Sequence, residues 1–507
     1  MISNLPMPMS ELDQGSRAKF EIENLPLIDE EEYPFTNFLW DRKLDLWPAR
    51  LYIGVLFFIV GVTQGYRGSA VLILQENGAS YEDQSFFTLS DLPYSFKIVL
   101  APIIDLFWSK KIGKCKTWVF GSSLIIFTVL ISFTLLSDGK VHPENVGQLC
   151  AVWTLINTVT ILLQITAEVW LVKIFENSIE KGKAAGMSNI SQTLGFFFGY
   201  NVFIPLNDVE WLNTYIFTSN PVTTPLMTNK GILIFTASLT LAAGLFTILF
   251  IAEKQCEKPF GDKPIRDYIR SIPKFFTLKS MQLLLTWIFI AKIFRVLIEE
   301  SLSLKLLDLG IKKTFFVNLG TILFPLTLLA ISLTTKFIKV GYICKANHLI
   351  NGYMAILLFV TWYIYYDLEQ NNNVHRTKIL IVISSIFERV YTNQLLQQAF
   401  VNTVASPEFG STFLTLTFAV SNASMTLPTS LGLKLVDMNL MPYHVLAMVC
   451  CVANVAVICV TYIMAVKLDK LDKRDFDFHS SAPARLTSSP DIDAFDVSYT
   501  DLRPYKK

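Results

Sequence analysis

Charged residues are scarce in this chain. Asp, Glu, Lys and Arg make up only 17% of its 507 residues, whereas about a quarter of the residues are charged in a typical soluble domain. The formal net charge is only +1, and a nucleic-acid partner would require a strongly basic face. The composition therefore excludes an ordinary water-soluble protein and argues against binding to nucleic acid.

Cysteine and histidine are also too scattered to form a structural framework. None of the seven cysteines forms a C-x-x-C pair, so neither a disulfide network nor a zinc site is indicated. Four cysteines lie within apolar runs, namely Cys150, Cys450, Cys451 and Cys459. The five histidines show no metal-ligand spacing. We therefore expect no bound metal and no cofactor.

What the sequence does contain is long apolar runs. Hydrophobic residues make up 52% of the chain, and the mean hydropathy is +0.43. The runs are long enough for helices of about 20 residues, the length that crosses a bilayer. They predict about twelve spans, near residues 50–74, 84–107, 117–137, 147–172, 184–206, 230–252, 280–303, 314–338, 346–367, 376–402, 410–434 and 441–467. The predicted fold class is an all-α polytopic membrane protein, and the lipid bilayer is its surroundings.

The longest connection between spans, 253–279, divides them into six and six. We expect an N-terminal six-helix bundle over 49–252 and a C-terminal six-helix bundle over 280–467. Two bundles joined by a central cytosolic loop are the plan of a major facilitator transporter. The polar tails, 1–48 and 468–507, have the composition of disordered cytosolic segments.

The orientation follows from the segment between Phe96 and Trp118, where two apolar spans flank a lysine-rich turn. Several lysines would be too costly in hydrocarbon, and basic loops favour the cytosolic side. Connections that alternate with this turn, such as 253–279, are also basic, whereas 75–83 and 138–146 are nearly free of Lys and Arg. The sequence therefore predicts that both termini are cytosolic.

The same turn predicts a cytosolic gate. Asp105 ends the second span, and Gly113 is followed by Lys114 and Lys116. An acid at a helix end and nearby lysines can hold helix ends together by charge pairing. The alternative is that these lysines serve only to orient the chain in the membrane.

Polar residues inside the spans are the candidates for substrate binding, because such transporters bind their cargo midway between the bundles. The substrate-binding candidates are Arg67, Lys97, Gln164, Lys292, Arg295, Arg389 and Gln394, and the gating or coupling acids are Glu168 and Glu299. Lys292, Arg295 and Glu299 share one helix face by their spacing. Cations facing a central cavity predict an anionic substrate. Alternatively, they neutralise Glu168, Glu299 and Glu388 as structural pairs.

Four separated segments share a more specific pattern. They contain Gln64-Gly65, Gly68-Ser69, Leu72–Gln75 and Asp83–Phe87; Ser95–Lys97, Ala101-Pro102, Asp105, Gly113 and Lys116–Trp118; Ala291-Lys292, Leu304–Leu306 and Gly310; and Thr415-Leu416, Ser421-Asn422, Pro428 and Leu435–Asp437. Together these segments resemble the acetyl-coenzyme A transporters of the major facilitator superfamily. The fourth span departs from that pattern, since Gln164 stands where the first of two acids would be and Val169 replaces a glycine.

The resemblance implies import of acetyl-CoA from the cytosol into the lumen of the endoplasmic reticulum by alternating access, without enzymatic chemistry. It implies residence in that membrane, with the Golgi or vacuole as alternatives. Arg67, Lys97, Lys292 and Arg295 would then contact the phosphates. A permease for another anionic or peptide-like solute, similar to muropeptide importers, is the alternative within the fold. A membrane-embedded acetyltransferase is less compatible, because it needs a histidine at mid-membrane, and His348, His375 and His444 lie near span ends.

Overall fold

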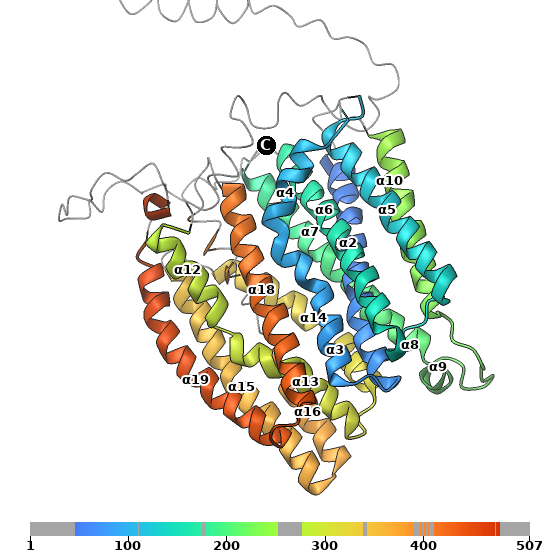
Figure 1. Ribbon diagram of the computed structural model, residues 1–507, viewed down its shortest axis with the longest axis vertical. Coiled ribbons are helices and arrows are strands. Elements are labelled where there is room, and N and C mark those ends of the chain that lie inside the picture. Colours follow the sequence, from blue (N-terminus) through green and yellow to red (C-terminus); the bar gives the residue numbers. More distant parts are fainter. Residues whose placement is uncertain are drawn as a thin grey trace, which may run out of the picture.

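The computed structural model describes residues 46–109, 111–174, 178–251, 276–337, 342–389, 396–397, 400–401, 404, 410–471 and 473–476. The described part of the chain is helical (Figure 1), which confirms the predicted all-α class. Nine of its helical stretches are long and apolar enough to cross a membrane. The stretches at 178–207, 374–388 and 410–437 do not meet that criterion within the described residues, so the count of twelve spans stays a prediction.

The helices of the first half follow the predicted spans. They are α2 (Leu46–Glu76), α3 (Tyr81–Thr88), η1 (Leu89–Phe96), α4 (Lys97–Leu106), α5 (Lys114–Ser137), η2 (Pro143–Asn145), α6 (Val146–Ile174), α7 (Ser178–Phe197), η3 (Phe198–Val202), α8 (Phe203–Asn207), α9 (Val209–Tyr215) and α10 (Asn229–Phe250).

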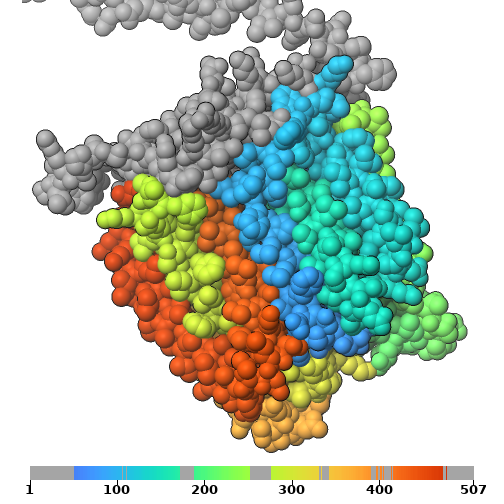
Figure 2. All heavy atoms as spheres, in the orientation of Figure 1, coloured from blue at the N-terminus to red at the C-terminus, as the bar shows by residue number. Residues whose placement is uncertain are grey.

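The helices of the second half follow after residue 278. They are α12 (Lys279–Ile290), α13 (Ile293–Asp308), α14 (Lys313–Phe337), α15 (Ile343–Asn371), α16 (Val374–Glu388), α18 (Gly410–Asp437), α19 (Tyr443–Leu468) and η4 (Lys473–Phe476). In Figures 1 and 2 the half coloured blue to green stands beside the half coloured yellow to red.

Apolar side chains cover the outside of these helices as well as the inside. Leu249 of α10, Leu349 of α15 and Val460 of α19 are each more than half exposed. Water would make such a surface unfavourable, whereas lipid tails are as apolar as leucine. The outer surface is therefore built to face a bilayer.

Each half has its own apolar core. The largest cluster is built mainly from residues before 252, around Leu56, Trp153 and Phe203. Another cluster contains only residues of the second half, including Leu302 and Tyr365. The predicted loop at 253–279, which would join the two bundles, lies almost wholly outside the described residues.

Glycines bring α2 and α7 into backbone contact. A Cβ atom added at Gly61 would lie 2.0 Å from the carbonyl oxygen of Gln192, and one added at Gly195 would lie 2.1 Å from that of Phe58. Such distances are far below van der Waals contact, so only glycine fits at these positions. The small residues thus set how closely α2 and α7 pack.

Several helical stretches are broken rather than continuous. The second stretch contains the 3-10 segment η1, which includes Pro93, and the fifth contains the π segment η3. The seventh is interrupted between α12 and α13, where Lys292 lies. Irregular backbone within a membrane is tolerated where it lines a protein interior or a cavity, so these breaks mark the region in which to search for a site.

Hydrogen bonds and ion pairs join the two halves at the ends of the helices remote from the turn at 107–113. We call this end the distal face. There the Gln75 amide donates to Asp308 at 2.7 Å, and the Lys313 ammonium is paired with Glu76. The Ser85 hydroxyl donates to the Ser430 carbonyl at 2.7 Å. The distal face is therefore closed in this conformation.

Candidate functional site

The basic turn between α4 and α5 has a specific backbone geometry. Gly113 has a φ of 102°, a left-handed conformation that favours glycine. Its N–H donates to the Ser109 carbonyl at 2.9 Å, and the Thr117 hydroxyl donates to the Gly113 carbonyl at 2.6 Å. Lys114 is buried, which goes beyond the needs of topology alone. The side chain of Asp105 lies outside the described part, so its gating role stays a prediction.

Arg67 of α2 contacts an acid that the sequence reasoning missed. Its Nη2 lies 3.0 Å from Oδ2 of Asp91 on η1, and its guanidinium lies over the ring of Phe87 at 5.2 Å. The Asn157 amide also donates to Asp91 at 3.0 Å. Asp91 could have been found from the sequence, because an ionised acid inside an apolar span requires a partner.

Lys97 forms the second pair. Its ammonium lies 2.8 Å and 2.9 Å from the two carboxylate oxygens of Glu168 on α6. The Gln164 amide donates to the same carboxylate at 3.1 Å. Lys97, Gln164 and Glu168, which the sequence analysis proposed as separate candidates, therefore lie together between α4 and α6.

The predicted face of the seventh span divides into two environments. The Arg295 guanidinium lies 2.7 Å from the carboxylate of Glu299, one turn further along α13. Lys292 instead lies at the helix break, and its ammonium donates to the Ser421 hydroxyl of α18 at 3.2 Å. Lys292 is only 4% exposed and has no acidic partner among the described residues.

A cavity of about 440 Å³ lies between the two halves. Its first wall comes from α7 and η3, and its second from α13, α14, α15 and α16. Its lining includes the polar or charged side chains of Tyr200, Asn201, Arg295, Glu299, Glu388 and Arg389. Among the sequence-predicted residues, the cavity thus collects Arg295, Arg389 and Glu299.

Arg389 follows the last residue of α16 and faces this cavity. It forms no ion pair within the part of the chain that the structure describes, and its Nε is buried without a hydrogen-bond acceptor there. A buried guanidinium nitrogen without an acceptor is costly. The other predicted residue of this region, Gln394, lies outside the described residues.

The predicted cations differ in whether they have a carboxylate partner. Arg67, Lys97 and Arg295 each have a carboxylate partner. For Lys97 and Arg295 these partners are Glu168 and Glu299, which the structural-pair alternative named, whereas the partner of Arg67 is Asp91, which it did not name. Lys292 and Arg389 have none among the described residues. Among the described residues, the acids Glu300 and Glu388 likewise form no ion pair, so the two unpaired cations are matched in number by two unpaired acids.

A chain of hydrogen bonds crosses the centre beside the pairs. The Gln192 amide donates to Gln64 at 3.0 Å, and the Gln64 amide donates to the Tyr94 hydroxyl at 3.0 Å. The Asn422 amide of α18 donates to the Tyr94 carbonyl at 3.2 Å. This chain links α7, α2, η1 and α18. Within the described ranges, no group of three or more His, Cys, Asp or Glu could hold a metal ion.

Comparison with known proteins agrees with this picture. The sequence pattern of the family described as "Acetyl-coenzyme A transporter 1" matches residues 50–267, which confirms the resemblance over that part of the chain. An uncharacterized protein of Schizosaccharomyces pombe is 24% identical over 398 residues, covering 76% of this chain and 74% of the relative. An uncharacterized membrane protein of Saccharomyces cerevisiae is 23% identical over 232 residues, 42% of this chain and 41% of the relative.

Solved structures with a similar fold are transporters. The xylose transporter XylE from E. coli, in an inward-open conformation, aligns with a TM-score of 0.56 and 11% identity, over 81% of this chain and 95% of that chain. The nucleoside transporter NupG aligns with a TM-score of 0.58 and 12% identity, over 82% and 99%. These likenesses show that the chain shares the fold of these solved structures.

Proposed function

We propose that this chain, a transporter of the major facilitator fold that resembles the acetyl-coenzyme A transporters, carries acetyl-CoA from the cytosol into the lumen of the endoplasmic reticulum. The family match over residues 50–267 supports the substrate class. The proposal includes twelve membrane-spanning helices, bundles at 49–252 and 280–467, and cytosolic termini.

One observation carries the proposal. The cavity between the two halves contains Arg389, a cation without an acidic partner among the described residues. A guanidinium with open hydrogen-bond positions suits a phosphate, which it can bind through two parallel hydrogen bonds. Acetyl-CoA carries several phosphates, so it would supply the acceptors that Arg389 lacks.

The aromatic wall of the cavity fits the other end of such a substrate. The rings of Phe196 and Tyr200 lie nearly parallel, with centroids 5.7 Å apart and an angle of 18° between their planes. Both residues line the cavity. A flat aromatic surface can stack on a purine base, and the Asn201 amide beside it can hydrogen-bond to the base edge.

The closed distal face supports access of substrate from the opposite end. Since α2, α3 and α9 are bonded across to the second half at that end, substrate would enter from the opposite, cytosolic end. The two bundles would then rock to release it into the lumen. Asp105, Gly113, Lys114 and Lys116 are the proposed cytosolic gate.

The cations that form ion pairs would contact substrate only after a change of partner. Arg67, Lys97 and Arg295 each bind a carboxylate in this conformation. They could contact a phosphate only if they released that carboxylate. Such an exchange would free Glu168 and Glu299 at the moment of binding, which would couple cargo to movement. Gln164 would change partner together with Glu168.

One feature favours the alternative of a peptide-like solute. The cavity holds Glu299 and Glu388 as well as Arg295 and Arg389, and such a mixture of charges also suits a zwitterion. The acetyltransferase alternative gains nothing from the described residues. His444 is bound to Glu369 at 3.0 Å, and neither residue lines the cavity.

The test is uptake of labelled acetyl-CoA into proteoliposomes. We expect saturable uptake that free CoA inhibits and an uncharged sugar does not. Arg389→Ala should reduce uptake at low substrate about tenfold or more, because a hydrogen bond to a charged group contributes about 1.5–3 kcal/mol. Lys378→Ala is the matched control, since it removes a cation of α16 that does not line the cavity.

Two results would overturn the proposal. One is a correctly folded protein that takes up a muropeptide or a sugar but not acetyl-CoA. The other is equal uptake by Arg389→Ala and the control. Microsomes from cells that express the protein, tested for delivery of label to the lumen, would test the direction and the membrane of residence.

A further inference from the structure

One polar side chain of the central cavity is held in a single orientation. It is that of Asn201, which lies on the π segment η3 and lines the cavity of about 440 Å³. Its amide nitrogen donates to the main-chain carbonyl of Val317 on α14 at 3.1 Å. Because a carbonyl oxygen only accepts hydrogen bonds, the amide cannot turn its own oxygen toward Val317 without repulsion. Asn201 therefore presents a fixed pattern of donor and acceptor.

This pattern leaves one donor and one acceptor for a ligand. The amide nitrogen of an asparagine carries two N–H groups, and the bond to Val317 uses one of those of Asn201. Among the described residues, no hydrogen bond reaches Oδ1 of Asn201. The second N–H and Oδ1 lie side by side on one amide, so they suit a partner that offers an acceptor beside a donor.

Gly320 of α14 makes room for this amide. A Cβ atom added at Gly320 would lie 2.6 Å from the Asn201 amide nitrogen, which is far below van der Waals contact, and 3.9 Å from Nη2 of Arg389. Both side chains therefore reach the same turn of α14. The amide lies beside the guanidinium to which we assign a phosphate, so one nucleotide can contact both.

The aromatic stack described above lies next to the amide along the chain. Tyr200, whose ring is nearly parallel to that of Phe196, immediately precedes Asn201 on η3. A base that stacks on these rings keeps its edge free for hydrogen bonds in the plane of the base. The site thus combines a surface for the face of a base with an amide for its edge.

Adenine matches the free groups of Asn201, whereas 6-oxopurines do not. Adenine has an amino group at C6 beside the acceptor N7, and an asparagine amide can bond to both at once. Guanine and hypoxanthine carry a carbonyl oxygen at C6, which would face Oδ1 as a second acceptor. The bond to Val317 prevents the amide from rotating to suit them.

We propose that Asn201 makes the central cavity selective for substrates that carry adenine over those that carry a 6-oxopurine, and that Gly320 is the positioning residue for its amide. The inference rests on the proposed function, since it takes the base of CoA as the group that Asn201 contacts. It goes further in assigning the choice of base to one hydrogen-bonded amide.

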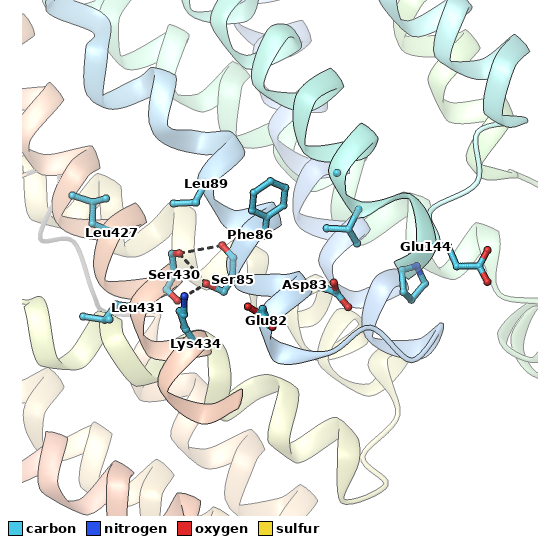
Figure 3. Close-up of a pocket in the computed structure, with 13 residues that line it drawn as sticks. Glu82, Asp83, Ser85, Phe86, Leu89, Glu144, Leu427, Ser430, Leu431 and Lys434 are labelled. Carbon is cyan, nitrogen blue, oxygen red and sulfur yellow. Dashed lines mark hydrogen bonds between the residues drawn. The ribbon is translucent and has the colours of Figure 1, made fainter. Parts of the chain in front are cut away.

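The selection belongs to one conformation. Asn201 lies in the first half and Val317 in the second, so their bond requires that η3 and α14 meet. In the same conformation the Ser85 hydroxyl donates to the Ser430 carbonyl at the distal face, beside a second cavity of about 650 Å³ (Figure 3). Opening of the distal face would separate the halves and release the amide. The base is therefore selected during loading and loses its fixed partner at release.

The experiment measures how well unlabelled nucleotides displace labelled ADP from the purified full-length protein in detergent. The competitors are ADP and inosine diphosphate, which share ribose and phosphates and differ in the group at C6. We expect ADP to compete about tenfold better, the discrimination that one bidentate contact to a base provides. Asn201→Ala should make the two nucleotides nearly equal. Gly320→Ala should do the same, because the new methyl group displaces the amide.

Two matched variants control for general effects. Asn318→Ala removes another amide that joins the halves, since Asn318 accepts from the Trp211 indole at 2.9 Å but does not line the cavity. Gly352→Ala adds a methyl group where a Cβ meets nothing within 4 Å. Both controls should keep the preference for ADP. Gly320→Ala should also keep its unfolding temperature, because the atom that must shift is the end of a side chain.

Three results would overturn the inference. They are equal competition by the two nucleotides in the wild type, an unchanged preference in both Asn201→Ala and Gly320→Ala, and no binding of ADP to the folded protein. Uptake of acetyl-CoA is measured separately in proteoliposomes. A protein that prefers ADP but takes up no acetyl-CoA would contradict the proposed function alone, whereas uptake without a preference between the nucleotides would contradict this inference alone.

Discussion

Lys97 and Glu168 are held together by both oxygens of the carboxylate, at 2.8 Å and 2.9 Å, across the contact of α4 with α6. Lys97 is 9% exposed at its side chain, whereas Glu168 is 42% exposed. The buried partner depends on the accessible one, so the two ends of this pair should respond unequally to substitution.

Removal of the carboxylate alone should therefore be the more damaging change. Glu168→Gln leaves a buried ammonium without a counter-charge, and we expect it to lower the free energy of unfolding by about 1–3 kcal/mol. Lys97→Met should cost less, since the remaining carboxylate can be hydrated. The measurement is the unfolding midpoint in detergent.

The double variant Lys97→Met/Glu168→Gln is the control for this pair. We expect it to regain most of the lost stability, because paired removal avoids an isolated charge. If it folds normally but loses uptake, the pair serves transport as well as stability. A double variant less stable than Glu168→Gln would contradict the ion-pair reading.

Gly195→Ala should separate α2 from α7. The new methyl group would lie 2.1 Å from the Phe58 carbonyl oxygen, and backbone on both sides prevents a cheap adjustment. Overpacking of this kind costs about 1–3 kcal/mol or more. Gly121→Ala is the matched control on α5, where an added Cβ meets nothing within 4 Å. A similar thermal shift in both variants would argue against the close contact.

Reversal of one charge at the distal face should open it. Lys313 of α14 is paired with Glu76 at the end of α2, so Lys313→Glu places two carboxylates together. We expect the distance between spin labels at His142→Cys and Asn439→Cys to lengthen, in a background without the exposed Cys459 and without Cys256. The exchanged pair Glu76→Lys/Lys313→Glu should restore the shorter distance. If the exchange fails to restore it while the protein stays folded, the pair does not hold this face closed.

The pH dependence of the closed distal face should not come from Lys312. Its hydrogen bond to Glu210, and the attraction of that carboxylate, raise the pKa of Lys312 above its ordinary value. A raised pKa means that the stabilisation is complete below the ordinary lysine pKa of about 10.4. It is lost only as pH rises through the higher value of the folded state.

We therefore expect Lys312→Gln to change the distance between the same labels equally at about pH 6 and about pH 8. Added salt should reduce the effect instead, because both partners are exposed and screened by ions. A difference between wild type and Lys312→Gln that grows across this neutral range would contradict the assignment.

The helical architecture could be predicted because hydropathy reports which segments face lipid. The predicted ranges coincide with α2, α5, α10 and α19 within a few residues at most boundaries. The partners inside the bundle could not be predicted in this way. Lys97 and Glu168 are 71 residues apart and Tyr81 and Asp308 are 227 apart, and such pairs depend on how helices rotate and cross.

The breaks in the helices were also not predicted. Pro93 gives a local signal for η1, but neither the π segment η3 nor the interruption at Lys292 follows from a proline there. Asp91 was missed because it lies in a span judged only by its average hydropathy. The gating role of Asp105 and the binding role of Gln394 concern side chains that the structure does not describe, and they stay predictions.

The interlocked glycines of α2 and α7 have a practical consequence. Because the two backbones touch at Gly61 and Gly195, the helices cannot slide or tilt against each other without collision. A pair of fluorophores placed on α2 and α7 should thus report a constant separation through a whole turnover. That pair would serve as an internal ruler against which any displacement of α13 or α18 can be measured in the same molecule.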